Sequence, residues 1–276
     1  MARIDAHQHF WLYQPERDAW ITDDMAVIRR DFGPADLEPL LEQHGFDGCV
    51  VVQSDQTEAE NDFQLANAAA NDFIRGVVGW VDLRAADVAE RLAYYSQFAK
   101  LKGFRHVLQG EADRALMLTP AFQRGIRALA AHGFTYDVLI FPDQLRHAAA
   151  LAAAHPNQPF VLDHIAKPYI RHGDIDGWKQ DLQQLAAHEN VWCKASGLIT
   201  EADWHRWQPA DFRPYLDVVF EAFGPGRVMF GSDWPVCLVA GRYGQVVDVV
   251  QQYLQSFSAD EQRRFWGDNA RQFYGL

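Results

Sequence analysis

Two histidines near the N-terminus, His7 and His9, are the residues best suited to chemistry in this sequence. They close the first apolar run at positions i and i+2, a spacing that points both side chains to the same face of a β-strand. Two neutral imidazoles converging on one point can bind a metal ion, or can polarise and protonate a substrate oxygen. A single His-x-His can equally be a strand cap beside packed aromatic residues. Asp233, which ends another apolar run far along the chain, favours the chemical interpretation.

The elements that must position these residues repeat one plan along the 276-residue chain. Short apolar runs alternate with amphipathic stretches of helical length, and they predict eight strands. We expect the strands at Ile4–His9, Gly48–Ser54, Gly76–Leu83, Gly103–Gln109, Thr135–Phe141, Phe160–His164, Val191–Ser196 and Val228–Asp233. Eight strands alternating with helices imply a parallel sheet that closes into a (β/α)8 barrel. No linker, charge block or low-complexity tract divides the chain, so we expect a single distorted barrel domain over residues 1–276.

Helix start signals support this alternation. Thr57 with Glu60, and Ser258 with Glu261, have the spacing of capping boxes. Both pairs predict that a helix begins just after the hydroxyl residue.

Composition limits the classes of function. With 49% hydrophobic and 22% charged residues, the chain can build a large core. A net charge of −12 without a basic stripe argues against a nucleic-acid partner. The scattered cysteines Cys49, Cys193 and Cys237 do not form a disulfide framework. The N-terminus lacks signal-peptide features and no apolar run reaches membrane-spanning length, so we expect a cytoplasmic protein without a membrane partner.

The predicted strand ends carry an unusual concentration of polar groups. In a (β/α)8 barrel the chemistry collects at the C-terminal ends of the strands. In strand order, these ends offer His7 and His9, Gln53, Trp80 and Asp82, Arg105 and His106, Asp137, Asp163 and His164, Lys194 and Ser196, and Asp233 and Trp234. A purely structural barrel has no need to crowd charges at one mouth. The sequence therefore predicts a functional site there.

These residues resemble the amidohydrolase superfamily. His7 and His9 on the first strand, His164 on the sixth and Asp233 on the eighth match its pattern. Five segments look like its lactone-hydrolysing branch: His7-Gln8-His9-Phe10-Trp11, Gly103-Phe104-Arg105-His106-Val107-Leu108-Gln109, Leu162-Asp163-His164-Ile165-Ala166-Lys167-Pro168, Cys193-Lys194-Ala195-Ser196-Gly197-Leu198 and Gly231-Ser232-Asp233-Trp234-Pro235. Within that branch they are most similar to sugar lactonases that act on L-fuconolactone and L-rhamnonolactone. The resemblance implies a barrel of the metal-dependent hydrolase type that hydrolyses a sugar 1,4- or 1,5-lactone to the aldonic acid.

One departure from the wider superfamily bears on the metal. Binuclear members use a fourth-strand lysine and a fifth-strand histidine, where this chain offers Arg105 and Asp137. Arginine stays protonated and cannot become a bridging ligand. The resemblance therefore implies at most one divalent metal ion such as Zn²⁺, held by His7, His9 and Asp233, with His164 as a further candidate ligand. We expect this metal to be dispensable, and we expect no organic cofactor.

The expected roles follow from what lactone hydrolysis requires. We assign Asp233 as the base that activates water, while His7, His9 or His164 orients the carbonyl and returns the proton. Arg105 and Lys194 are the candidate cations for the oxyanion, although Arg105 could equally pair with a strand-end carboxylate, Asp82 or Asp137. The further candidate substrate-binding residues are His106, Gln53, Asp137, Ser196, Trp234 and Trp11.

The segment from Phe10 to Phe32 is longer than most connections in a compact domain, and such loops often serve as lids. Its aromatic residues could stack on a sugar ring, or they could simply plug the barrel. They are Trp11, Tyr13 and Trp20, and the stretch around Trp204, His205 and Trp207 is a second candidate wall.

Other functions remain open at this point. A sister branch of the superfamily decarboxylates small carboxylic acids with a metal bound to the same histidines and aspartate. Hydrolysis of a non-sugar lactone, such as a pyrone or muconolactone, is another alternative. A barrel that binds a sugar acid without turning it over is a third, but binding alone does not need Asp233 beside three histidines. The sequence gives no indication of the oligomeric state.

Overall fold

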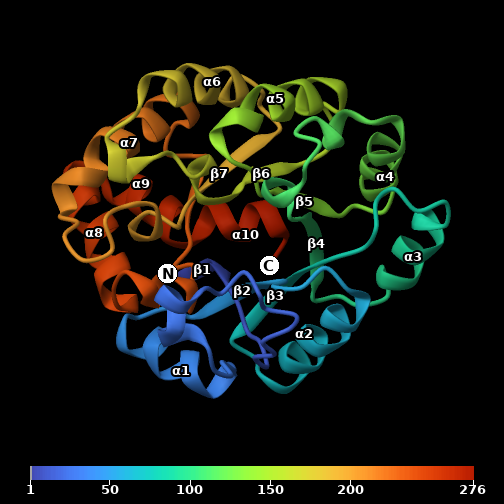
Figure 1. Cartoon of the computed structure of the whole chain (residues 1–276), viewed down its shortest axis with the longest axis horizontal. Coiled ribbons are helices and arrows are strands. Elements are labelled where there is room, and N and C mark those ends of the chain that lie inside the picture. Colours follow the sequence, from blue (N-terminus) through green and yellow to red (C-terminus); the bar gives the residue numbers. More distant parts are fainter. Residues whose placement is uncertain (1) are drawn as a thin grey trace.

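Eight parallel strands form one sheet in the computed structural model, which describes residues 2–276. Each strand pairs with the next strand along the chain, in the order β1 to β8. The strands are β1 (Ile4–Gln8), β2 (Gly48–Val52), β3 (Ile74–Gly79), β4 (Leu101–His106), β5 (Thr135–Val138), β6 (Phe160–Leu162), β7 (Val191–Ala195) and β8 (Val228–Phe230). Helices surround this sheet on its outside (Figure 1).

The sheet closes between β8 and β1 just beyond the last residues of these strands. The Asp233 amide donates to the His7 carbonyl oxygen at 2.8 Å, and the His9 amide donates to the Trp234 carbonyl oxygen at 2.7 Å. The predicted (β/α)8 barrel is therefore confirmed. The closure of the barrel also brings His7 and His9, at the end of the first strand, next to Asp233, which follows the last strand.

The helices follow the strands as the alternation predicted. They are α1 (Pro34–Gln43), α2 (Glu58–Ala70), α3 (Val88–Tyr95), α4 (Pro120–Ala131), α5 (Leu145–Ala154), α6 (Asp176–Ala186), α7 (Pro209–Phe223), α8 (Tyr243–Tyr253), α9 (Ala259–Arg263) and α10 (Asn269–Tyr274). Thr57 and Ser258 each accept a hydrogen bond from the amide three residues later. The reciprocal bond of the capping box forms at Ser258, whereas the Glu60 carboxylate bonds to Ser54 instead.

All eight strands are shorter at their C-terminal ends than the apolar runs predicted. β6 ends at Leu162 and β8 at Phe230, so His164 and Asp233 lie in the loops that follow. Their backbones are left-handed, with φ of 53° and 57°, and cannot continue a strand. The chain leaves the sheet at the point where its side chains turn into the mouth of the barrel.

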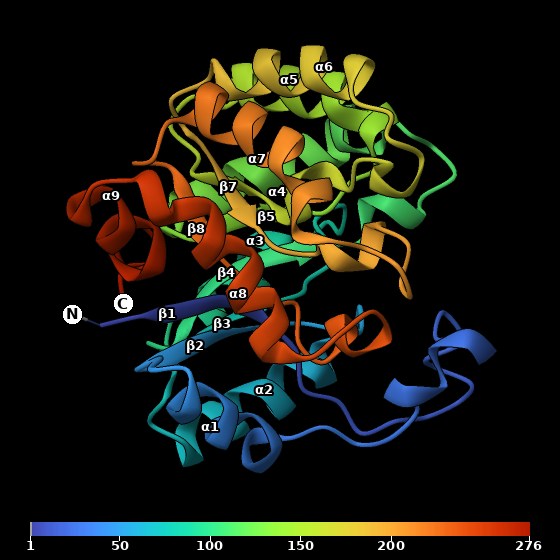
Figure 2. The ribbon, with the colours of Figure 1, turned by 90° about the vertical axis from the view of Figure 1, so that its left-hand side faces the viewer.

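The barrel is filled differently at its two ends. At the base, inward-facing residues such as Ala6, Val50 and Val161 pack against α10, which lies across the centre of the barrel in Figure 1. Figure 2 shows both termini at this end, while the segment between β1 and α1 lies at the opposite end. The C-terminal mouth is thus the open end. Among the described residues, none of the helices combines the length and apolar character needed to cross a bilayer.

Candidate active site

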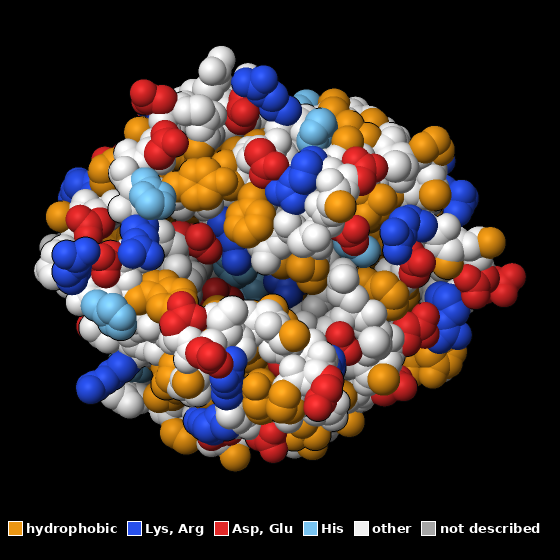
Figure 3. All heavy atoms as spheres, in the orientation of Figure 1, with side chains coloured by type: hydrophobic (Ala, Val, Ile, Leu, Met, Phe, Trp, Pro, Cys, Tyr) orange, Lys and Arg blue, Asp and Glu red, His pale blue; other side chains and the backbone are white. Residues whose placement is uncertain are grey.

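A cavity of about 500 Å³ opens at the C-terminal mouth, and Figure 3 shows it as a hollow with basic and histidine side chains at its bottom. Loops that follow several different strands contribute to its wall. Its polar lining residues are His9, Arg17, Ser54, Asp55, Gln56, Arg105, Gln109, His164, Lys167, Thr200, Glu201 and Asp233. Its apolar lining residues are Trp11, Trp20, Met25, Val107, Leu139, Trp204, Val236 and Val239. An apolar cavity wall with a few convergent polar groups is typical of a small-molecule site.

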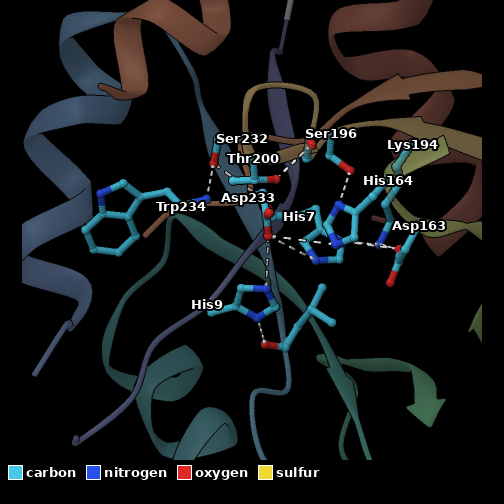
Figure 4. A network of polar contacts seen from close by, with 12 residues as sticks. His7, His9, Asp163, His164, Lys194, Ser196, Thr200, Ser232, Asp233 and Trp234 are labelled. Atoms are coloured by element: carbon cyan, nitrogen blue, oxygen red, sulfur yellow. Dashed lines mark hydrogen bonds and ion pairs between the residues drawn. The ribbon is translucent and has the colours of Figure 1, made fainter. Parts of the chain in front are cut away.

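Three imidazoles surround one carboxylate oxygen at the floor of this cavity (Figure 4). Asp233 Oδ1 lies 3.4 Å from His9 Nε2, 3.8 Å from His164 Nε2 and 3.9 Å from His7 Nε2. All four side chains are almost completely buried. The sequence predicted this convergence, and the structure brings the four residues together.

Two of these side chains, His164 and Asp233, are oriented by a left-handed backbone conformation. His164, Ile165, Ala166 and Lys167 form a left-handed turn with φ between 49° and 60°, and Asp233 has φ 57°. Such conformations cost roughly 1 kcal/mol or more for each non-glycine residue, and they cluster at functional sites. The turn places both His164 and Lys167 in the cavity wall.

Gly197 provides the space for this turn. Its φ is +64°, and a Cβ atom added there would lie 2.8 Å from His164 Nδ1. A side chain at position 197 would therefore strain the backbone and displace the imidazole.

Hydrogen bonds on the far side of each ring fix the histidines. His9 Nδ1 lies 2.7 Å from the Val52 carbonyl oxygen, which can only accept, so the Nδ1 proton is used there. The other ring nitrogen, His9 Nε2, points toward Asp233. His164 Nδ1 lies 2.9 Å from the Ser196 hydroxyl. Burial lowers the pKa of His7 and of His164 well below its ordinary value, so both rings are neutral at pH 7.

A layer of buried charges lies beneath His7. Arg105 Nη1 is 3.1 Å from Asp163 Oδ2 and 3.3 Å from His7 Nε2. Lys194 Nζ contacts Asp137 Oδ2, and it lies 3.0 Å from Asp163 Oδ1 and 3.1 Å from His7 Nδ1. Asp163 Oδ1 is in turn 3.2 Å from His7 Nδ1. A carboxylate behind a histidine ring orients the ring and selects its tautomer.

The three buried carboxylates have different electrostatic surroundings. Burial raises the pKa of Asp137 to about 6, against the opposing effect of Lys194. For Asp163, burial also acts to raise the pKa, but Lys194, His7 and Arg105 outweigh it and hold the pKa well below its ordinary value. For Asp233, the effect of burial is outweighed by His164 and His9, which leaves its pKa lowered. Asp233 is therefore an ionised carboxylate at neutral pH.

Several residues expected to contact substrate do not line the cavity. Two of them, Lys194 and Asp137, are fully buried behind His7. Gln53 follows the end of β2 and is also buried, and its side-chain amide donates to the Arg105 carbonyl oxygen. Ser196 is also buried and acts on His164 rather than on the cavity. None of these four residues lines the cavity, and their expected contact with substrate stays a prediction.

His106 and Trp234 do not line the cavity either, and their expected contact with substrate also stays a prediction. His106 follows Arg105 on β4, and neighbouring residues of a strand point to opposite faces of the sheet. His106 turns outward to Glu111, with 2.7 Å between His106 Nε2 and Glu111 Oε1. Trp234 packs against Phe10 and Phe32. Arg105 does line the cavity, as does Trp11.

The expected partner of Arg105 is also corrected. The structure pairs Arg105 with Asp163, and not with Asp82 or Asp137. Asp82 is partly exposed and pairs with Arg84. Sequence reasoning placed Asp163 at a strand end but gave it no role, and the adjacent His164 was the available signal.

The segment from Phe10 to Phe32 forms part of the cavity wall, through Trp11, Arg17, Trp20 and Met25. Trp204 lines the cavity as well, whereas His205 and Trp207 border a separate outer hollow. This segment therefore forms one side of the mouth and does not plug the base.

Loop residues that the sequence did not single out complete the polar wall. Lys167 Nζ lies 3.6 Å from Glu201 Oε1, and Arg17 reaches the cavity from the long segment. Arg17 and Glu201 lie outside the quoted motifs, and Lys167 lay within one without an assigned role. Asp5 supports the site from behind, since its carboxylate accepts the Ser232 amide at 2.9 Å and so holds β1 beside β8.

The site fits a single metal ion. His7, His164 and Asp233 each offer one ligand atom, and these atoms lie within 4.8 Å of one another. Two imidazole nitrogens and a carboxylate suit Zn²⁺ with an open position. His9, which was expected in this set, is 3.4 Å from Asp233 but is not part of this group, whereas His164, the further candidate, is. The choice of ligands stays a prediction. Arg105 already places a positive charge 3.3 Å from His7 Nε2.

Comparisons with known proteins agree with this geometry. A family model described as Amidohydrolase matches residues 4–276. An L-fucono-1,5-lactonase of Burkholderia multivorans is 43% identical over 99% of this chain and 96% of its own length, and an L-fucono-1,5-lactonase of Burkholderia ambifaria is 40% identical over the same shares. A crystal structure of an amidohydrolase from Burkholderia multivorans with bound zinc superposes with a TM-score of 0.96, at 42% identity and full coverage of both chains.

Proposed function

The chain belongs to the amidohydrolase family, and we propose that it hydrolyses a sugar lactone to the open aldonic acid. The proposed substrate is an aldono-1,5-lactone or aldono-1,4-lactone of the L-fuconolactone type, by similarity to the two lactonases. The observation that carries the chemistry is Asp233, an ionised carboxylate encircled by three imidazoles at the floor of the cavity.

The charge of the cavity wall supports a neutral polyol substrate. Three cationic residues of the lining are balanced by three carboxylates: Arg17, Arg105 and Lys167 against Asp55, Glu201 and Asp233. An anionic pyrone, or a small carboxylic acid destined for decarboxylation, would be bound better by a wall with excess positive charge. A sugar needs donors and acceptors for its hydroxyl groups together with an apolar surface, and this wall offers both.

Asp233 is placed to act on water. Its carboxylate takes a proton as the water oxygen bonds to the lactone carbonyl carbon, and the carbonyl electron pair moves onto oxygen. Arg105, whose guanidinium lines the cavity, stabilises the resulting oxyanion. When the tetrahedral intermediate collapses, the bond between the carbonyl carbon and the ring oxygen breaks. The proton held by Asp233 then passes to the departing ring oxygen, directly or through the neutral His164.

A metal ion is not required for these steps. His7, His164 and Asp233 would hold one Zn²⁺, which would polarise the carbonyl and acidify water when bound. Arg105 supplies positive charge from the protein itself, and a lactone is a more electrophilic substrate than an amide. We therefore propose that hydrolysis continues without the metal.

The long segment after β1 serves as the wall that holds the sugar. Trp20 lines the cavity while remaining 44% exposed, so its ring is available to a ligand. Aromatic faces stack on the apolar face of sugar rings. Trp204 lines the same cavity from the segment that follows β7.

The test is a substrate panel with the purified protein and a pH indicator. We expect acid release from L-fucono-1,5-lactone well above spontaneous hydrolysis, lower rates with other aldonolactones, and no turnover of a dicarboxylated pyrone or a carboxylated phenol. Asp233→Asn protein is the matched control for contaminating activity. Faster turnover of the anionic compounds than of any sugar lactone would contradict the proposal.

A further inference from the structure

The cations that line the cavity differ in where their carboxylate partners lie. Arg105 pairs with Asp163 at 3.1 Å, and Arg17 pairs with Asp18 at 2.7 Å. Asp163 and Asp18 are almost completely buried and do not line the cavity. A ligand therefore cannot reach the carboxylates that neutralise these two guanidinium groups.

Lys167 is the third cation, and its partner stands in the cavity wall itself. Lys167 Nζ lies 3.6 Å from Glu201 Oε1, and both residues line the cavity. Their side chains are 18% and 21% exposed. Among residues 2–276, Glu201 is the one carboxylate within ion-pair distance of Lys167. The charge of Glu201 therefore decides whether Lys167 is available to an anionic ligand.

The backbone on both sides of the cavity fixes this pair. Lys167 ends the left-handed turn, where its amide donates to the His164 carbonyl oxygen at 2.7 Å. Glu201 follows Thr200, whose carbonyl oxygen accepts the indole N–H of Trp204 at 2.8 Å. The two side chains therefore start from positions that do not depend on their contact with each other.

The distance between the two charged groups leaves both available to a ligand. Hydrogen bonds between an ammonium and a carboxylate usually measure about 2.7–2.9 Å, and the 3.6 Å between Lys167 and Glu201 is longer. The ammonium can donate to a sugar hydroxyl oxygen, while the carboxylate accepts a hydroxyl hydrogen. A carboxylate group on the ligand could accept from Lys167, but Glu201 would repel it.

We propose that Glu201 is a specificity-determining residue, which pairs with Lys167 so that the cavity accepts a lactone with a hydroxyl group at this place and rejects one with a carboxylate. The pair forms a subsite for the hydroxyl groups of the sugar. The kinetic consequence rests on the proposed lactone hydrolysis, whereas selective binding can be measured without turnover.

Asp55 provides a matched control for the loss of one negative charge. Its carboxylate lines the same cavity and accepts hydrogen bonds from the Gln56 amide at 2.9 Å and the Thr57 hydroxyl at 3.1 Å. Within the described residues 2–276, Asp55 forms no ion pair. Asp55→Asn therefore changes the charge of the cavity as Glu201→Gln does, but it frees no cation.

The test uses two lactones with the same ring and configuration. L-galactono-1,4-lactone ends in a neutral hydroxymethyl group, and in L-galactaro-1,4-lactone this group is a carboxylate. The first readout is kcat/KM on each lactone for wild type, Glu201→Gln, Asp55→Asn, Lys167→Gln and the double variant Lys167→Gln/Glu201→Gln. The second readout is the dissociation constant of each lactone, measured by calorimetry with the same substitutions in Asp233→Asn protein.

We expect Glu201→Gln to lower the preference for the neutral lactone at least about tenfold, with tighter binding of the carboxylated lactone. Asp55→Asn should shift this preference by about threefold or less. Lys167→Gln should shift the preference in the opposite direction, because Glu201 then repels the carboxylated lactone without a neighbouring cation. In the double variant, the gain in binding of the carboxylated lactone should disappear.

An unchanged preference in a folded Glu201→Gln protein would overturn the proposal. An equal shift in Asp55→Asn would also overturn it, since the net charge of the cavity would then explain the effect. A gain that persists in the double variant would show that Lys167 is not the partner.

Two further outcomes keep the test decisive. If Glu201→Gln does not fold, Lys167→Gln decides, and a preference that does not rise in that protein would contradict the proposal. If the wild-type protein hydrolyses no sugar lactone, the proposed function fails, and the dissociation constants still decide the role of Glu201.

Discussion

Replacing the Asp233 carboxylate by an amide should abolish most of the turnover while leaving the fold and the binding of substrate intact. Asn keeps the size of the side chain, and it tolerates the left-handed backbone at this position, where φ is 57°. The backbone bonds of Asp233 to His7 and Cys237 do not involve the side chain. Asp233→Asn therefore removes the base and little else.

The size of the loss follows from the role of the carboxylate. Its Oδ1 atom is the acceptor at the centre of three imidazoles at 3.4, 3.8 and 3.9 Å, and an amide oxygen in the same place cannot take a proton from water. General-base catalysis contributes about 10²- to 10⁴-fold, which is roughly 2.7 to 5.4 kcal/mol of transition-state stabilisation. We expect kcat to fall by at least the lower figure and KM to change by about threefold or less.

The assay is acid release from an aldonolactone at several concentrations, for wild type, Asp233→Asn and the control Asp217→Asn. Asp217 lies on the outer helix α7, so its substitution should leave kcat unchanged. The melting temperature of each protein reports the fold. Asp233→Asn activity within a few-fold of wild type would remove Asp233 from the mechanism, and would leave it only as a residue that shapes the turn before Trp234.

Further predictions concern the turn, the lid, the metal and the thiols. Gly197→Ala should lower kcat more than tenfold, because its Cβ would lie 2.8 Å from His164 Nδ1. Gly173→Ala, where φ is +68° and the surrounding space is open, should cost only about 1 kcal/mol of stability and leave kcat unchanged. Equal effects of the two substitutions on kcat would contradict this reasoning. Trp20→Ala should raise KM several-fold with little change in kcat, and Leu12→Ala on the same segment, which does not line the cavity, should change neither constant. Removal of metal by a chelator should leave the rate of lactone hydrolysis within a few-fold of the untreated rate. Elemental analysis should find at most one metal ion per chain. Two metal ions per chain whose removal abolishes activity would contradict this prediction, because Arg105 occupies the position of a bridging ligand. Burial raises the pKa of the Cys49, Cys193 and Cys237 thiols, so none should react with a disulfide reagent at pH 8 until the protein is unfolded.

Residue type and strand phase were enough to predict the centre of the site. His7, His9, His164 and Asp233 stand at strand ends, and a barrel brings strand ends together whatever the details of its loops. Alternation along a strand also explains why Arg105 faces the cavity and His106 does not, although the sequence analysis did not apply it there.

Depth within the barrel could not be predicted in the same way. Lys194 and Asp137 have the inward phase expected of them, but they lie a layer below the cavity floor. The layer that a residue occupies depends on how neighbouring strands are offset along the barrel. A single sequence carries no signal for this offset.

The remaining residues near the site could not be predicted because their positions do not follow from a regular sequence pattern. Lys167 reaches the cavity only because four residues in succession are left-handed, a conformation that the sequence Ile165-Ala166 gives no reason to expect. Tyr274 was not among the candidate residues. Its contact with Asp137 arises because α10 packs across the base of the barrel, which is a tertiary arrangement and not a local pattern.

The most direct measurement follows L-fucono-1,5-lactone by ¹H NMR in the presence of the wild-type protein, with Asp233→Asn protein and buffer alone beside it. We predict disappearance of the lactone and matching appearance of the open aldonic acid at a rate far above both controls. A wild-type rate no greater than the buffer rate, at protein concentrations where the fold is verified, would contradict sugar-lactone hydrolysis by this site.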